Sequence, residues 1–146
     1  MKKHLLILFA ALLPLVASAQ TKVEIDGIWY NLTSETQQAE VTFKGSSYDE
    51  YSEVYSGSIN LPATVTYEGV DYSVTSIGEY AFFYCTRLTA ITIPEGVTSI
   101  GSGAFQSCSR LTAITIPEGV TSIGDYAVTT CSSLASITIP ESVTTI

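Results

Sequence analysis

Three cysteines are the side chains of this sequence best suited to nucleophilic, redox or metal chemistry. Cys85, Cys108 and Cys131 occupy the same place in three successive copies of one segment. A zinc site needs ligands that converge on one point, usually four of them, and a ladder with one cysteine per copy separates them instead. We therefore favour a column of buried thiols that pack as small hydrophobic groups. Neighbouring copies about 5 Å apart would also allow a disulfide between two of the cysteines. A disulfide, a metal site and a catalytic role are therefore the alternatives.

A stretch rich in tyrosine and carboxylates lies between two expected strands, from residue 48 to residue 55. Tyrosine gives a large amphipathic contact area at a low entropic cost, which suits a recognition loop. Tyr48, Tyr51 and Tyr55 are therefore candidate partner-binding residues. The carboxylates of the stretch do not follow the spacing of an EF-hand loop, which alternates ligands around a central glycine. A solvated loop and weak calcium binding are the alternatives.

Threonines at recurring positions form the second candidate binding surface. Period-two alternation points Thr92 and its equivalents outward, and Thr89 and its equivalent, which precede that stretch, are expected to face outward too. Together they would form a flat, neutral face. High β-propensity alone is the alternative explanation for threonine at these positions. The candidate residues are Thr89, Thr92, Thr112, Thr115 and Thr138.

The N-terminal residues 1–19 have the pattern of a secretory signal peptide. A basic start is followed by an apolar run too short to span a bilayer, and Ala17-Ser18-Ala19 is a typical cleavage site. The mature chain would begin at Gln20, without a transmembrane span, outside the cell or at its surface; an uncleaved anchor is the alternative. Cleavage changes the net charge from −8 to about −10, because two lysines leave and all fourteen carboxylates stay. This acidity argues against a nucleic-acid partner.

The composition also argues against an enzyme. His4 is the only histidine and would be removed with the signal peptide, which deprives the mature chain of the commonest general base. No serine-hydrolase elbow, P-loop or dinucleotide-binding glycine pattern is present. The recurring Glu95, Glu118 and Glu141 stand beside prolines in equivalent turns, which indicates a solvated row. We expect no catalytic site and no cofactor.

Self-similarity with a period of 23 residues decides the expected architecture. Residues 74–96, 97–119 and 120–142 are near-identical copies, and a fourth begins at Val143. This period lies within the range of about 20–29 residues for leucine-rich repeats. We predict a mainly β solenoid with short helical turns, in which stacked copies share one continuous core.

Each copy can be divided into short elements. Leu88, Ile91 and Ile93 have the spacing of a strand with an inward apolar side, and Pro94 ends that strand. Gly101 would permit a tight bend. The segment from Ala104 to Cys108 has the spacing of one helical turn with an inward face.

The recurring blocks L-x-x-I-x-I-P, V-x-x-I-G and A-F-x-x-C resemble the BspA-like leucine-rich-repeat family of bacterial surface proteins. They run from Leu88 to Pro94, Val97 to Gly101 and Ala104 to Cys108, with copies over residues 74–146. The third copy departs from the pattern, because Val128 replaces the phenylalanine. The resemblance implies adhesion to extracellular host proteins or to other cells.

The two ends of the repeat array differ. Residues 20–73 are expected to form a β-rich N-terminal cap, with one hairpin turning at Asp26-Gly27 and another at Glu68-Gly69. Residues 58–77, which overlap the start of the copy at 74–96, would be a degenerate first repeat. We expect no comparable cap at the C-terminal end. Truncation of a longer repeat array is the favoured explanation, and self-association through this end is the alternative. The functional hypotheses are protein binding and adhesion, a structural spacer for another domain, and carbohydrate binding.

Overall fold

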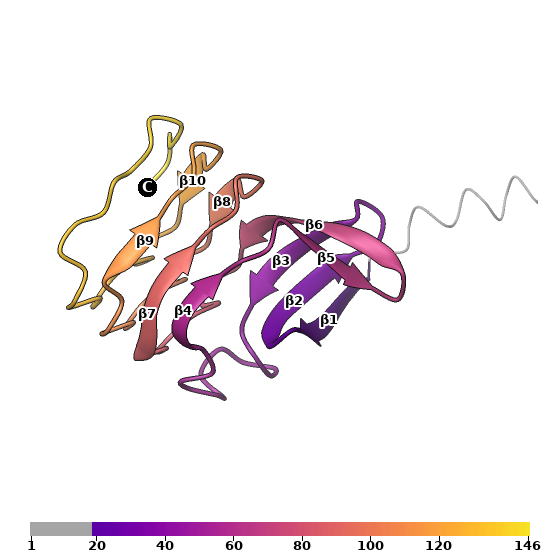
Figure 1. Ribbon diagram of the computed structural model, residues 1–146, viewed down its shortest axis with the longest axis horizontal. Coiled ribbons are helices and arrows are strands. Elements are labelled where there is room, and N and C mark those ends of the chain that lie inside the picture. The colour runs from indigo at the N-terminus through magenta and orange to yellow at the C-terminus, as the bar shows by residue number, and fades with distance from the viewer. Residues whose placement is uncertain (1–18) are drawn as a thin grey trace, which may run out of the picture.

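The structure, a computed structural model, describes residues 19–146 and contains ten strands in two sheets, with no helix in this range (Figure 1). The expected signal peptide lies, apart from Ala19, outside the described residues. The strands β1 to β3 and the hairpin β5–β6 form one end of the molecule, and the last copy of the repeat forms the other end (Figure 1).

The N-terminal strands form an antiparallel meander. It consists of β1 (Gln20–Ile25), β2 (Ile28–Thr33) and β3 (Gln38–Thr42). Asp26 and Gly27, between β1 and β2, have φ angles of 50° and 83°. Two left-handed residues in a two-residue connection match the right-handed twist of the flanking strands, which explains the Asp-Gly sequence. The predicted hairpin is confirmed.

The first sheet continues from this meander into short parallel strands. A second hairpin joins β5 (Thr64–Tyr67) to β6 (Val70–Ile77) through Glu68-Gly69, as predicted. Strand β6 lies parallel to β3 and then pairs with β8 (Ser99–Ile100), which pairs with β10 (Ser122–Ile123). Ile77, Ile100 and Ile123 are therefore neighbours across the sheet, although 23 residues separate each from the next.

The second sheet is parallel and has three strands, β4 (Ser56–Asn60), β7 (Arg87–Thr92) and β9 (Ala113–Thr115). Ile59 pairs with Ile91, and Ile91 pairs with Ile114, so β4 occupies the place that its Ile-Asn-Leu-Pro sequence predicted. The equivalent segment of the third copy, residues 135–139, forms no strand. This segment comes after β9, the last strand of the sheet. No further strand in the described range lies on its other side to pair with it.

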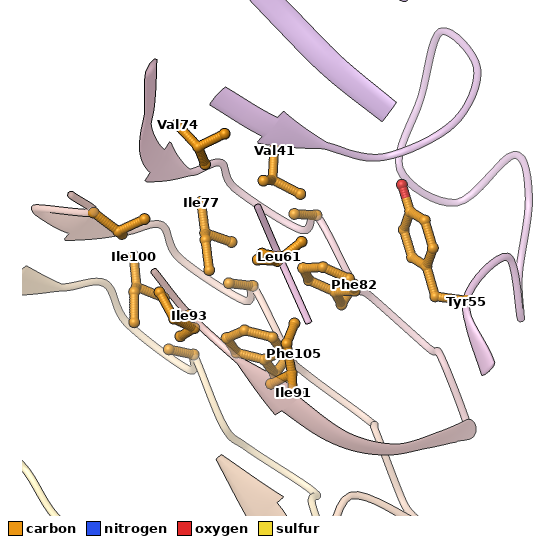
Figure 2. Close-up of a cluster of buried hydrophobic side chains, with 14 of the residues drawn as sticks. Val41, Tyr55, Leu61, Val74, Ile77, Phe82, Ile91, Ile93, Ile100 and Phe105 are labelled. Carbon is orange, nitrogen blue, oxygen red and sulfur yellow. The ribbon is translucent and has the colours of Figure 1, made fainter. Parts of the chain in front are cut away.

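The core fills the space between the two sheets. Leu88, Ile91 and Ile93 are buried, as their spacing predicted. Figure 2 shows Ile91 and Ile93 of one sheet directed toward the same interior as Ile77 and Ile100 of the other. The outer faces of the two sheets remain at the surface of the molecule, with exposed residues on β7 and β9.

The segments that follow the short strands of the first sheet are chains of hydrogen-bonded turns, and the predicted helical turn is wrong. In the first copy the amides of Ala81, Phe83 and Cys85 donate to carbonyls three residues earlier. The amides that alternate with them, of Tyr80, Phe82 and Tyr84, donate to the carbonyls of Ser102, Ala104 and Gln106 of the next copy at 2.7–3.0 Å. A helix would direct every amide back along its own chain, so the alternate bonds to a neighbour exclude one.

Glycine 101 is required by close packing between copies, and not by the tight bend expected from the sequence. A Cβ atom at this position would lie 2.5 Å from the backbone nitrogen of Glu79. Gly101 donates its amide to the carbonyl of Ile77 at 2.8 Å. Only a residue without a side chain allows two backbones to approach this closely.

Candidate functional site

The outer face of the second sheet carries threonines in adjacent positions. Thr92 pairs with Thr115 in the parallel register, and Asn60 of β4 precedes Thr92 in the same row. All three residues are exposed. We name the row of Asn60, Thr92 and Thr115 the strand-face row. It places one amide and two hydroxyl groups side by side on a regular surface.

Hydrogen bonding divides the candidate threonines into two groups. The Thr112 hydroxyl donates to the carbonyl of Thr89 at 3.1 Å, and the Thr112 amide donates to the same oxygen at 2.9 Å. This hydroxyl therefore supports the contact between neighbouring copies. The hydroxyls of Thr92 and Thr115 have no partner within residues 19–146. They are free to bond to water or to another molecule.

Thr138 does not extend the strand-face row. It is exposed, but it lies in the segment 135–139, which does not pair with β9. The equivalence of its position in the sequence suggested a third strand. In the described range β9 is the last strand of this sheet, so this segment adds no further strand to it.

A second column of threonines, which the sequence analysis missed, lies beside the first sheet. The hydroxyls of Thr98, Thr121 and Thr144 each donate to the backbone carbonyl of the threonine 23 residues earlier, at 3.2–3.4 Å. The signal was present in the V-T-S-I block of every copy. These hydroxyls bridge adjacent copies, so their recurrence has a structural explanation that the strand-face row lacks.

The loop of residues 46–53 presents two of the three candidate tyrosines at the surface. The Tyr48 ring stacks on Tyr80 with centroids 4.1 Å apart and contacts Phe83 edge-on. The Nζ atom of Lys44 lies 4.7 Å from the centroid of the Tyr51 ring, a favourable cation–π distance. Both tyrosines keep an exposed surface, and they remain candidates for a contact with a partner.

Tyr55, the third candidate tyrosine, follows this loop and is part of the core, so its predicted role as a surface contact is wrong. It is only 3% exposed, and its ring lies 4.8 Å from that of Phe82. Its hydroxyl donates to the carbonyl of Thr42 and accepts the amide hydrogen of Trp29. Burial raises the pKa of Tyr55. Alternating aromatic and acidic residues gave no sign that this ring turns inward.

The carboxylates of the loop hold its own backbone. Glu50 accepts hydrogen bonds from the amide and the hydroxyl of Ser46 at 2.8 and 2.9 Å, and these bonds lower the pKa of Glu50. Asp49 accepts a hydrogen bond from the Ser47 hydroxyl. Across residues 19–146 no group of three or more histidine, cysteine or acidic side chains is arranged to hold a metal ion.

The three cysteines are free thiols within the core. The Sγ atom of Cys108 donates to the carbonyl of Phe82, and that of Cys131 donates to the carbonyl of Phe105, both at 3.1 Å. Each of these thiols therefore binds the preceding copy in the same way. Burial raises the pKa of Cys85 to about 11 and also raises the pKa of Cys108. A buried, protonated thiol is a poor nucleophile, which is the property of a structural cysteine.

An apolar cavity of about 330 Å³ opens at the C-terminal end of the stack. Phe105 and Val128 line it together with isoleucines of both sheets. Phe82 is covered by the ring of Phe105, but Phe105 is followed by the smaller Val128. The reduced side-chain volume at position 128 leaves part of this end of the core unfilled.

Short parallel strands, inward leucines and isoleucines, and copies that bond edge to edge define a leucine-rich-repeat fold. Residues 51–146 match six copies of the family described as the BspA type leucine rich repeat region. The chain belongs to this family. Comparison with curated proteins gives no match.

Crystal structures of leucine-rich repeat proteins support this assignment. The chain is 37% identical to one from Bacteroides ovatus, with a TM-score of 0.72 over 83% of this chain, and spans 30% of that protein. It is 31% identical to one from Bacteroides capillosus, with a TM-score of 0.69, over 84% of each chain. The leucine rich repeat protein of T. pallidum is 21% identical over 86% of this chain and 64% of its own, with a TM-score of 0.59, and shares the fold.

No helix among the described residues is long and apolar enough to cross a membrane.

Proposed function

We propose that this chain is a secreted or surface-attached protein-binding module without catalytic activity, which adheres to an extracellular protein through the outer face of its β4–β7–β9 sheet. The 23-residue copies would form a short solenoid whose role is to hold this face flat. The signal-like sequence of residues 1–19 supports export. N-terminal sequencing of the exported protein should begin at Gln20, and retention of the whole chain in the cytoplasm would contradict export.

The observation that carries this proposal is the difference between the two kinds of threonine. Thr98, Thr121 and Thr112 use their hydroxyls to bridge copies. Thr92 and Thr115 lie in register on an exposed face, with hydroxyls that have no partner in residues 19–146. A hydroxyl can both donate and accept, so such a row suits hydrogen bonding to a protein surface.

The size of this face limits its affinity. The longest strand of this sheet, β7, has six residues and spans about 20 Å, and three strands about 4.8 Å apart give a patch of at most roughly 280 Å². A stable interface needs about 800 Å² on each partner. We therefore expect weak binding by one chain, which becomes strong when many copies lie on one surface and bind together.

Binding of the chain without residues 1–19, displayed in many copies on beads, to immobilised extracellular matrix proteins tests the proposal. The double variant Thr92→Lys with Thr115→Lys should lose binding by at least about tenfold, because two charged side chains would interrupt the neutral face. The matched control is Thr64→Lys with Ser73→Lys, an exposed pair that faces across strands β5 and β6. Equal binding by the two double variants would contradict a site on the strand face.

Carbohydrate binding is the second candidate function, favoured by the exposed aromatic surface around residues 46–53. Tyr48 and Tyr51 keep exposed rings, and Tyr84 lies beside the Tyr48–Phe83 pair with half of its surface exposed. Aromatic rings of this kind can stack on sugar rings. Glycan binding that is lost in Tyr51→Ala but kept in the Thr92→Lys and Thr115→Lys variant would favour this function. If the multivalent chain binds neither proteins nor glycans, a role as a structural spacer is the better explanation.

A further inference from the structure

An open hollow of about 480 Å³ lies on the outer face of the first sheet, where the N-terminal meander meets the repeats. Asn31 of β2 pairs with Glu40 of β3, so their side chains leave the sheet on the same face. Tyr30 and Val41 alternate with them and point into the core. We call this place the carboxylate hollow. The residues that line it are Lys22, Asn31, Glu40, Thr42, Phe43 and Glu79.

The carboxylate of Glu40 is held in one position by its neighbours. Its Oε1 atom accepts a hydrogen bond from the side-chain nitrogen of Asn31 at 3.0 Å. The same carboxyl group packs against Gly78, where a Cβ atom would lie 2.9 Å from the Cδ atom of Glu40. The next residue is the exposed Glu79. In residues 19–146 the second oxygen of Glu40 and the carboxylate of Glu79 have no partner.

Thr42 brings a buried hydroxyl to the carboxylate hollow. This residue is only 3% exposed, and its hydroxyl has no hydrogen-bond partner in residues 19–146. In the same range every fully enclosed side-chain nitrogen or oxygen atom does have a partner. The Thr42 hydroxyl is therefore not fully enclosed and opens into the hollow that Thr42 lines. A polar group that is mostly removed from water gains a hydrogen bond when a ligand enters.

The free groups of the carboxylate hollow are mainly hydrogen-bond acceptors. The carboxylates of Glu40 and Glu79 can only accept hydrogen bonds. The side-chain oxygen of Asn31 also accepts only, because the nitrogen of this amide already donates to Glu40. The Thr42 hydroxyl can donate and accept. A ligand that fits this arrangement must therefore bring several donors.

Lys22 is the one cation that lines the hollow, and its ammonium group is already engaged. It donates to the carbonyl of Gly45, and its Nζ atom lies 3.9 Å from the centroid of the Phe43 ring. Two carboxylates and one ammonium leave the hollow with an excess of negative charge. The whole chain is acidic as well, with a formal net charge of −8. The local charge and the overall charge therefore both attract a cation.

We propose that the carboxylate hollow binds the guanidinium group of an arginine side chain in an extended segment of a partner protein. A guanidinium is always charged and presents five N–H donors in one plane, so it can bond to both carboxylates and to a further oxygen. An ammonium group offers three donors from a single atom. This site lies on the other sheet from the strand-face row, so it does not depend on the adhesion proposed above.

A second hollow continues from the same two carboxylates along the repeats and would receive the main chain of the segment. Glu40 and Glu79 line this second hollow too, together with Ser99, Gly101 and Ser122. Ser99 pairs with Ser122 across β8 and β10, which gives the second hollow a regular, uncharged floor. Small residues at these positions allow another backbone to approach the sheet closely.

An amide NMR titration of the purified protein with a five-residue peptide, acetyl-Ser-Gly-Arg-Gly-Ser-amide, tests the proposal. The side-chain amide of Asn31 and the backbone amide of Glu79 should shift with a saturable dependence on peptide concentration. The control peptide carries citrulline, which keeps the shape of arginine but has no charge. It should bind at least about tenfold more weakly, because charge-assisted hydrogen bonds are lost. A peptide with lysine in place of arginine should also bind more weakly.

Two substitutions locate the site. Glu79→Gln removes one charge at an exposed position and should weaken binding of the arginine peptide at least about tenfold. Its matched control is Glu118→Gln, at an exposed carboxylate of a repeat turn, which should leave binding unchanged. Thr42→Val removes the hydroxyl with little change in volume, and it should also weaken binding while the remaining amide spectrum stays the same.

Three results would overturn the proposal. The first is equal or tighter binding of the citrulline or the lysine peptide. The second is an equal affinity of the Glu79→Gln and Glu118→Gln variants for the arginine peptide, which would indicate a general attraction to an acidic protein. The third is a set of shifts that leaves Asn31 and Glu79 unmoved.

Discussion

The aromatic ring of Phe82 stacks on that of Phe105, with centroids 5.2 Å apart and an angle of 11° between the planes. These residues are equivalent positions of successive copies, and both are completely buried. Each ring therefore fills the space that the neighbouring copy leaves open. The stack joins the copies through packing, while the alternate amides of the turn segments join them through hydrogen bonds.

Replacement of Phe105 by alanine should destabilise the protein strongly. Phe105→Ala removes a buried ring from the middle of the stack, so we expect a loss of about 3–5 kcal/mol in the free energy of unfolding. Urea denaturation of the chain without residues 1–19 measures this loss. Tyr84→Ala, at a half-exposed ring that contacts Phe83 outside this stack, should cost far less. Similar losses for the two variants would contradict the packing described here.

A larger side chain at position 128 should stabilise the protein. Val128→Phe restores the side chain that the other copies carry, beside a cavity of about 330 Å³ and next to Phe105. Cavity filling of this kind typically adds about 0.5–2 kcal/mol. Thermal unfolding should show a higher midpoint for Val128→Phe and a lower one for Val128→Ala. A lower midpoint for Val128→Phe would indicate that the cavity lacks room for a ring.

Two glycines, Gly96 at the end of the first copy and Gly101 in the second, should respond differently to the same substitution. In Gly101→Ala the new Cβ atom would lie 2.5 Å from a backbone nitrogen of the preceding copy, which forces the copies apart. In Gly96→Ala it would lie 3.4 Å from the Val74 carbonyl oxygen, an ordinary contact. We expect a loss of about 1–3 kcal/mol for the first variant and little change for the second. Equal midpoints in urea would argue against close backbone contact at Gly101.

Stability should fall as the pH rises above about 8.5. An unfolded cysteine releases its proton near this pH, whereas burial raises the pKa of Cys85 in the folded protein to about 11. Between the two values the folded state binds more protons, so the stabilising contribution of the buried thiol is complete below pH 8.5 and is lost as the pH approaches 11. Urea denaturation should show a loss of about 1 kcal/mol from Cys85 alone between pH 7 and pH 9.5.

The variant Cys85→Ala provides the control for this pH dependence. Its stability at pH 7 should be lower, but its decline toward pH 9.5 should be shallower than that of the unaltered chain. An identical decline would show that Cys85 contributes nothing to it. Thiol-specific labelling at pH 8 should also be slow in the folded protein and fast in urea, because the protonated form predominates in the core.

Features that depend on one strand or one turn could be predicted from the sequence. The Asp26-Gly27 hairpin needs two left-handed residues, and this sequence supplies them. The inward positions of Leu88, Ile91 and Ile93 follow from the L-x-x-I-x-I pattern of the copies, in which Ile91 and Ile93 alternate with Thr92. The β4 strand could be found because Ile59-Asn60-Leu61-Pro62 has the pattern of the later copies.

Features that depend on the neighbouring copy could not be predicted in this way. The spacing of Ala104, Phe105 and Cys108 suits a helical turn, and only the bonds of alternate amides to the next copy, such as that of Phe105 to Ala127, exclude it. Thr112 and Thr115 are both exposed threonines of one copy, yet only the Thr112 hydroxyl donates to the copy before it. Tyr55 was misplaced because its partners, Thr42 and Trp29, belong to distant strands.

The most direct measurement of the proposed binding surface uses methyl NMR of the threonines. The chain without residues 1–19, labelled at the threonine methyl groups, is titrated with the matrix protein that the multivalent chain retains. Thr92 and Thr115 should shift or broaden, whereas Thr98 and Thr121, whose hydroxyls bridge copies, should stay unchanged. Shifts confined to Thr98 and Thr121, with Thr92 and Thr115 unmoved, would contradict binding through the strand face.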